Sequence, residues 1–286
     1  ENSVISGLTG GDKLQLGDSS TSQGLTFNLN FVSISGIEVL DIRQSNTIVN
    51  ADTVTWAVLN QIRTDTGATN ITLNSFGSNL NLSNASISSG VTTLSARAEF
   101  TFGVNIFDGS DGGGRTLIGS NNRDTLNGRD GDDTFNFFGG EDTISGGAGD
   151  DIFNVTSAAD LVDRKEISGG LGSDTVRLTS GEVSQLSLND FSNFLDVELI
   201  DLSGGASVGV AFSISNADQI DNTLNSAGVT IRGGSGPDSI IVRENGNEFR
   251  YKTIFDSIES VTLSDNGSFQ RLAFSPDTSF INSSSV

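Results

Sequence analysis

The chain has 286 residues, of which 36 are acidic and 15 basic, so its formal net charge at neutral pH is −21. A chain this acidic is a poor partner for nucleic acids and for anionic membranes, because like charges repel. It contains no cysteine and no histidine, which excludes disulfides, histidine-dependent nucleophilic catalysis and a typical zinc site. No run of about eighteen apolar residues occurs, so the sequence predicts no membrane insertion.

The N-terminal part of the chain predicts short β-strands. Residues 7–16 contain one Gly-Asp turn, with Gly10 in a glycine position and Asp12 in the acid position. Alternating polar and apolar runs that are typical of strands follow at 25–34, 36–44, 69–95 and 98–107. Segment 56–62 fits either a short helix or a buried strand.

The segment 119–154 repeats with a period of nine residues. Each unit has an aspartate and, two residues later, a large apolar residue. The pairs are Asp124 and Leu126, Asp133 and Phe135, Asp142 and Ile144, and Asp151 and Phe153. Side chains alternate along a strand, so the four apolar residues are expected to face inward.

If each unit is half a coil, alternate units stack, which places Asp124 near Asp142 and Asp133 near Asp151. Stacked strands lie about 4.8 Å apart, and carboxylates at this spacing repel unless a cation lies between them. Calcium suits such a site because it accepts six to eight oxygen ligands in irregular geometry. The alternative is a solvated, acidic, glycine-rich loop.

The pattern resembles the Gly-Gly-x-Gly-x-Asp nonapeptide of the RTX (repeats-in-toxin) family. The resemblance implies a parallel β-roll with calcium as cofactor in its turns. It extends the candidate metal site to the turn glycines of the central repeat, which are Gly128, Gly131, Gly140, Gly147 and Gly149. No glycine equivalent is assigned at position 122, which is occupied by Asn122.

Single copies of the turn recur outside the central repeat. One contains Gly170, Gly172 and Asp174, and another contains Gly234, Gly236 and Asp238. At 110–118 the register is kept, but Arg115 takes the acid position. This turn is either a cap in which a guanidinium replaces a cation or a chance match.

A glutamate between apolar residues follows each isolated copy by 21 to 26 residues: Glu38, Glu198 and Glu259. Each is either an exposed strand residue or a carboxylate that completes a calcium site with the aspartate of a neighbouring coil. The tripeptide Asn-Ala-Asp at 50–52 and 216–218 fits a turn or a helix cap, with a ligand role for Asp52 or Asp218 as the alternative.

These repeats predict an all-β fold, a continuous parallel β-solenoid, with a roll joined to β-sandwich lobes as the alternative. We expect an N-terminal β module at 1–108, a central roll at 109–160, and C-terminal β modules with the tail at 161–286.

The resemblance further implies a bacterial protein exported unfolded by type I secretion and folded by extracellular calcium. Because repeated β modules fill the chain and no nucleophile, zinc or phosphate motif is present, the sequence predicts a structural protein and not an enzyme. We expect it to self-associate into a surface layer or filament at the cell surface, as RTX-type surface-layer proteins do. The alternatives are an adhesin segment that binds a surface or a cell-surface glycan, and the secretion module of a toxin or enzyme.

Overall fold

The computed structural model describes the chain in ranges with gaps between them. They are 3–6, 12–17, 24–29, 32–35, 37–57, 59–64, 68–96, 103–108, 112–157, 159–162, 166–179, 185–187, 193–204, 211–214, 229–233, 239–242, 254–256, 260–263, 273–274 and 279–282. The chain divides into two compact units. Unit 1 comprises Glu1–Phe137 and Asp142–Gly149, and unit 2 comprises Phe138–Glu141 and Asp150–Val286.

The described residues of unit 1 form short strands and one short helix. The elements are β1 (Ser3–Ser6), β2 (Asp12–Leu16), β3 (Thr26–Asn28), β4 (Val32–Ser35), β5 (Ile37–Ile42), β6 (Ile48–Ala51), α1 (Thr53–Ala57), β7 (Gln61–Thr64), β8 (Ile71–Ser75), β9 (Asn79–Asn81), β10 (Ser86–Ile87), β11 (Val91–Ala96), β12 (Asn105–Phe107), β13 (Thr116–Ile118), β14 (Thr125–Asp130), β15 (Thr134–Asn136) and β16 (Thr143–Ala148).

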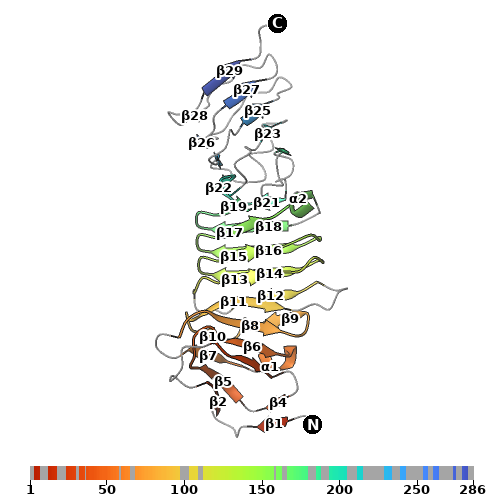
Figure 1. The fold of residues 1–286 in the computed structure, drawn as a ribbon, viewed down its shortest axis with the longest axis vertical. Helices are drawn as coiled ribbons and strands as arrows, with labels where there is room; N and C mark the ends of the chain where they lie inside the picture. Colours follow the sequence, from red (N-terminus) through yellow and green to blue (C-terminus); the bar gives the residue numbers. More distant parts are fainter. Residues whose placement is uncertain are drawn as a thin grey trace. The chain divides into compact units, whose positions relative to one another are not determined.

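The strands of unit 1 form parallel sheets in which each strand pairs with the equivalent strand of the next coil. The sheet orders within this unit are β3-β6-β8-β11-β13-β15, β9-β12-β14-β16, β2-β5-β7-β10 and β1-β4. Figure 1 shows β11, β13 and β15 stacked on one side of the coils and β12, β14 and β16 on the other. Parallel pairing of successive coils makes this unit a β-solenoid.

The core of unit 1 lies between its sheets. One inward-facing file along the longest sheet of this unit consists of Val49, Leu73, Leu94, Leu117 and Phe135, all fully buried. Leu126 and Ile144 extend the facing file. The prediction that these apolar positions of the nonapeptide face inward is therefore confirmed.

Unit 2 has the same construction. Its elements are β17 (Ile152–Val155), α2 (Ala159–Val162), β18 (Glu166–Leu171), β19 (Thr175–Leu178), β20 (Gln185–Ser187), β21 (Phe194–Leu195), β22 (Leu199–Asp201), β23 (Ala211–Ile214), β24 (Thr230–Arg232), β25 (Ser239–Val242), β26 (Ile254–Asp256), β27 (Ser260–Leu263), β28 (Ala273–Phe274) and β29 (Ser279–Asn282). The orders within this unit are β17-β19-β22-β24-β26-β28, β18-β21 and β20-β23-β25-β27-β29.

All strand pairs with a described register are parallel, so the expected parallel solenoid is confirmed in both units. None of those registers is antiparallel, so they do not support the alternative of β-sandwich lobes. In unit 2, Phe153, Val176, Ile200 and Ile231 form the inward file of the long sheet, and all four are buried.

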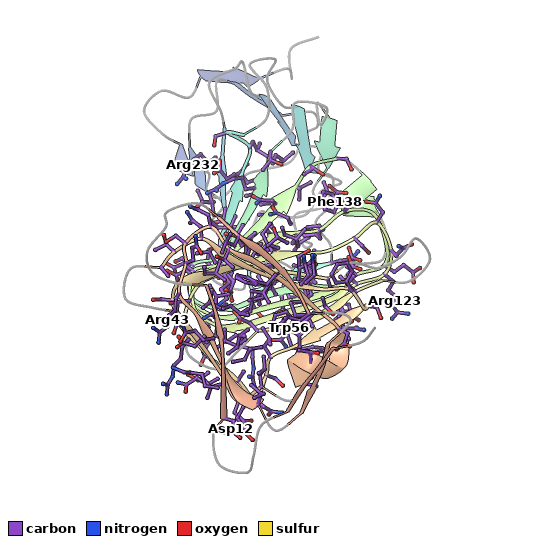
Figure 2. All side chains as sticks on the ribbon, turned by 60° about the horizontal axis from the view of Figure 1, so that its bottom comes forward. Asp12, Arg43, Trp56, Arg123, Phe138 and Arg232 are labelled. Carbon is purple, nitrogen blue, oxygen red and sulfur yellow. The ribbon has the colours of Figure 1, made fainter. Side chains whose placement is uncertain are left out.

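Two short helices, α1 and α2, occur among the described residues. The segment 56–62 contains the end of α1 and the start of β7, so each alternative is correct for part of it. Trp56 of α1 is buried and lies among the interior side chains (Figure 2). Asp52 caps this helix, because its Oδ1 accepts the Thr55 amide at 2.7 Å, as the cap interpretation predicts. Within the described ranges, no helix has the length and apolar character needed to span a membrane.

Candidate metal centre

The first candidate metal ligands are the aspartates of the Gly-Asp turns. Each of them lies directly before a strand whose central side chain faces the core. Asp124, Asp133, Asp142, Asp151 and Asp174 are all at most 1% exposed. Carboxylates are rarely buried this completely unless hydrogen bonds or cations compensate for the lost hydration. The hydrogen-bond partners of these carboxylates therefore determine whether the turns have oxygens left to bind a cation.

In Asp124, Asp133, Asp142 and Asp174, one carboxylate oxygen accepts a backbone amide from the previous coil of the same unit. In unit 1, Asp124 Oδ1 accepts the Val104 amide at 2.7 Å, and Asp142 Oδ1 accepts the Asp124 amide at 2.9 Å. The predicted neighbourhood of Asp124 and Asp142 is therefore confirmed. Asp133 Oδ1 accepts the Arg115 amide at 2.7 Å in the same way. In unit 2, Asp174 Oδ1 accepts the Asp151 amide at 2.9 Å.

Two of the three recurring glutamates make the same contact. Glu38 Oε2 accepts the Asp12 amide at 2.9 Å, and Glu198 Oε2 accepts the Asp174 amide at 2.6 Å. Each glutamate thus reaches the aspartate of a neighbouring coil, as the sharper of the two interpretations required. The contact in the structure is to the backbone, so a shared metal remains a prediction.

The second carboxylate oxygen distinguishes the turns. Asp124 Oδ2 accepts the Ser120 amide at 2.6 Å, and its Oδ1 also accepts the Ser120 hydroxyl at 2.7 Å. In contrast, the Oδ2 atoms of Asp12 and Asp174 are buried without a hydrogen-bond partner in the described part of the chain. An anionic oxygen without a partner is costly to bury. A hard cation with oxygen ligands would remove that cost at both places.

Acidic neighbours increase the need for a cation at Asp174. Burial is the largest of the causes that raise its pKa, and the Asp151 amide opposes this shift. The charges of Glu198, Asp150 and Asp196 also raise the pKa, and the net result is a value of about 6. Because the folded pKa lies above the unfolded value of 3.8, ionisation of Asp174 weakens the fold as pH rises through this window. At neutral pH the ionised carboxylate is therefore destabilising in the absence of a cation.

The glycines make room for the carboxylates and carbonyls. A Cβ on Gly128 would collide with Asp133 Oδ2, and one on Gly169 would collide with Asp174 Oδ2 and the Asp196 carbonyl. The turns thus pack oxygens at positions where only glycine fits. Positive φ angles of 114° to 141° occur at Gly131, Gly140, Gly147, Gly149, Gly170 and Gly172.

At position 122, the backbone N–H of Asn122 donates to Ser120 Oγ at 3.1 Å, and the Ser120 hydroxyl donates to Asp124 Oδ1, so a serine side chain takes part in this first turn. Five of the predicted ligands lie outside the described residues: Gly10, Gly234, Gly236, Asp238 and Glu259. Asp218 lies outside them as well.

Asp108 was not singled out in the sequence, although it is fully buried and pairs with Arg115. Asp150 and Asp196 were also missed. Asp150 directly precedes a repeat aspartate and Asp196 lies two residues before Glu198, so their positions in the repeat were the available signal.

The aspartates and glutamates do not converge into a ready-made site. Among the described residues, no group of three or more acidic side chains is placed to hold a metal ion. The fit to calcium therefore depends on the orphaned oxygens of Asp12 and Asp174 and on the turn carbonyls. Comparison with family models, curated proteins and solved structures finds no match for this chain.

Proposed function

We propose that the chain is a secreted, calcium-binding structural protein of the RTX type, which assembles into an extracellular surface layer or filament. The observation that carries the proposal is the Asp174 turn. There a fully buried carboxylate has an oxygen without a partner in the described structure, and three acidic residues raise its pKa. A bound divalent cation would neutralise this charge.

The residues that would hold calcium are the turn aspartates, the glutamates of the following coil and the backbone carbonyls of the glycine turns. Asp12 with Glu38 and Asp174 with Glu198 are the two pairs in which both carboxylates are described. When bound, calcium supplies positive charge and accepts oxygen ligands from two coils. The chain itself positions those oxygens through the amide contacts between coils.

Calcium binding of this kind couples to folding. A cation held by the folded coil and only weakly by the unfolded chain stabilises the fold in proportion to RT ln(1 + [L]/Kd). Calcium is scarce in the cytosol and abundant outside cells, so the chain would fold after export. This matches the secretion route that the RTX resemblance implies.

Two features favour an assembly role. The parallel coils occupy both units, and the outermost strands of parallel sheets carry backbone groups that can pair with another chain. Bridging of acidic surfaces by calcium would add contacts between subunits of a chain whose net charge is −21.

Electron microscopy of the purified protein tests this proposal. With millimolar calcium we expect sheets or filaments, and with a chelator we expect them to disperse. A protein that folds with calcium but stays monomeric at high concentration would contradict the assembly role. A protein whose folding and association do not depend on calcium would contradict the whole proposal.

A second candidate, an adhesin segment, is favoured by the outer face of the β3-β6-β8-β11-β13-β15 sheet. Thr72, Thr93, Thr116 and Thr134 are aligned in register along it. Beside this file, the amides of Asn28, Asn50 and Asn74 hydrogen-bond to one another at 2.7 and 2.9 Å, and Asn50, which is 7% exposed, supports this face and does not form its accessible surface. An uncharged array with a repeat of about 4.8 Å would suit a neutral glycan.

Glycan-array binding distinguishes the two candidates. Binding by the calcium-loaded monomer that is lost in Thr93→Lys and Thr116→Lys, with folding unchanged, would support the adhesin. Binding that these variants leave intact would exclude this face.

A further inference from the structure

The strands on either side of the Arg115 turn keep the register of the repeat, but the charges at the turn positions differ. The registers align Thr116 with Thr134, so Arg115 occupies the position of Asp133, and the amide contact between these residues agrees with this. Phe107 aligns with Asn127, and the Asp108 amide donates to the Asn127 carbonyl, so Asp108 occupies the position of Gly128. The usual glycine and aspartate are thus replaced by an aspartate and an arginine.

The guanidinium of Arg115 has the kind of ligands that a calcium ion takes. Its Nη1 donates to Asp108 Oδ2 at 2.9 Å and to the Gly113 carbonyl at 2.8 Å. Its Nη2 donates to the Ile87 carbonyl of the preceding coil at 3.2 Å. One carboxylate and two carbonyls therefore surround a positive charge inside the turn, and both ionic side chains are almost completely buried.

We infer that Arg115 is a built-in counterion, which allows its coil to form without calcium. The inference deepens the proposed function, and rests on it only for the claim that other coils need calcium. Arginine is suited to this role because its planar guanidinium stays charged when buried and presents several donors in fixed geometry. The segment 104–118 would then be a calcium-independent part of unit 1.

The sequence separation explains how the larger pair is accommodated. Asp108 and Arg115 are seven residues apart, whereas the equivalent Gly128 and Asp133 are five apart. In the shorter turn, a Cβ on Gly128 would collide with the aspartate, so two long side chains would not fit there. The longer connection and the ion pair are therefore parts of one arrangement.

Replacement of Arg115 by aspartate should convert this turn into one that depends on calcium. Arg115→Asp places an aspartate before Thr116 and Leu117, as Asp124 stands before Thr125 and Leu126, and leaves Asp108 as a second carboxylate. Arg115→Met, in contrast, removes the charge and supplies no new oxygen. The two variants thus remove the same guanidinium but should differ in their response to calcium.

Hydrogen exchange of the full-length protein, resolved by segment and measured in chelator, calcium and magnesium, tests the inference. In the wild type we expect 104–118 to stay protected in chelator while 166–178 loses protection. Arg115→Met should lower protection of 104–118 by roughly a hundredfold in all three conditions, because the buried Asp108 loses its ion pair with Arg115. Arg115→Asp should lower it in chelator and magnesium and recover with calcium.

Arg123→Met is the matched control, because Arg123 belongs to the next turn but is exposed and lies at the periphery of the coil (Figure 2). It should behave as the wild type does. Protection of 104–118 that is lost from the wild type in chelator, or kept in Arg115→Met, would overturn the inference. So would an Arg115→Asp protein that calcium does not restore.

The two proposals fail differently. A wild type in which 166–178 stays protected in chelator would contradict the proposed calcium dependence, yet the Arg115→Met result would still decide the role of the guanidinium.

Discussion

The Arg115 turn of unit 1 and the Asp174 turn of unit 2 share the position of the repeat aspartate but differ in charge balance. At Arg115 a buried guanidinium contacts one carboxylate and two carbonyls. At Asp174 a buried carboxylate has an oxygen without a partner in the described structure, and three acids raise its pKa. The same position of the coil thus contains a fixed cation in one turn and requires a bound cation in the other.

Asp41 of unit 1 shows the same internal compensation on a strand. Burial alone would raise its pKa, but hydrogen bonds from Lys13 and Arg43 lower it below the usual value. Lys13 Nζ lies 2.9 Å from Asp41 Oδ2. Fixed cations can therefore replace a metal where the chain places arginine or lysine beside the carboxylate.

The largest expected loss of stability comes from substitutions in the hydrophobic core, whose packing should be equally tight in unit 1 and unit 2. Phe135→Ala in unit 1 and Phe153→Ala in unit 2 each remove a fully buried ring, and each should cost about 3–5 kcal/mol of unfolding free energy. Denaturant unfolding in calcium measures both. A much smaller cost for Phe153→Ala would mean that the units differ in packing and not only in their turns.

The next prediction compares Asp124, whose two carboxylate oxygens both accept hydrogen bonds, with Asp174, whose Oδ2 has no partner in the described structure. In the wild type, Asp124 Oδ2 accepts the Ser120 N–H. Asp124→Asn places an amide group against this N–H, so the variant should lose about 1–3 kcal/mol of unfolding free energy with or without calcium. Asp174→Asn keeps the Oδ1 acceptor and removes a buried charge, so it should stabilise the calcium-free protein. It should also weaken calcium binding by about tenfold or more.

Thermal unfolding at neutral pH, in calcium and in chelator, measures both variants. Equal responses of Asp124→Asn and Asp174→Asn to calcium would remove the distinction between the two turns.

Glu198 tests whether the glutamate acts through its charge or through its oxygen. Glu198→Gln can still accept the Asp174 amide but no longer raises the pKa of Asp174, so that pKa should fall. Glu198→Ala leaves the amide without this acceptor and should cost about 1 kcal/mol. NMR titration of Asp174 and denaturant unfolding separate these results. An unchanged Asp174 pKa in Glu198→Gln would contradict the electrostatic account.

The smallest effect belongs to the cap of α1. Asp52→Ala removes the acceptor for the Thr55 amide and should cost about 1 kcal/mol, equally with and without calcium. A calcium-dependent loss in this variant, measured by thermal unfolding, would instead favour a ligand role for Asp52.

The regular features of the fold were predictable because they depend on periodicity. The nine-residue spacing placed Leu126 inward and brought Asp124 next to Asp142, since a parallel coil repeats every two units. The ion pair of Asp108 with Arg115 was harder to predict from the sequence, because it depends on where a longer turn returns to the coil. Glu198 was ambiguous because a glutamate on an alternating strand is usually exposed, and only the register shows that it reaches the Asp174 amide.

The central claim is that calcium completes the Gly-Asp turns, and a calcium titration of the full-length protein in chelator-treated buffer tests it most directly. Thermal unfolding followed by circular dichroism should show a midpoint that rises with calcium but not with an equal concentration of magnesium. At a calcium concentration of about 100 times Kd, one site adds about 2.7 kcal/mol to the stability. A midpoint that stays the same from chelator to millimolar calcium would contradict the account.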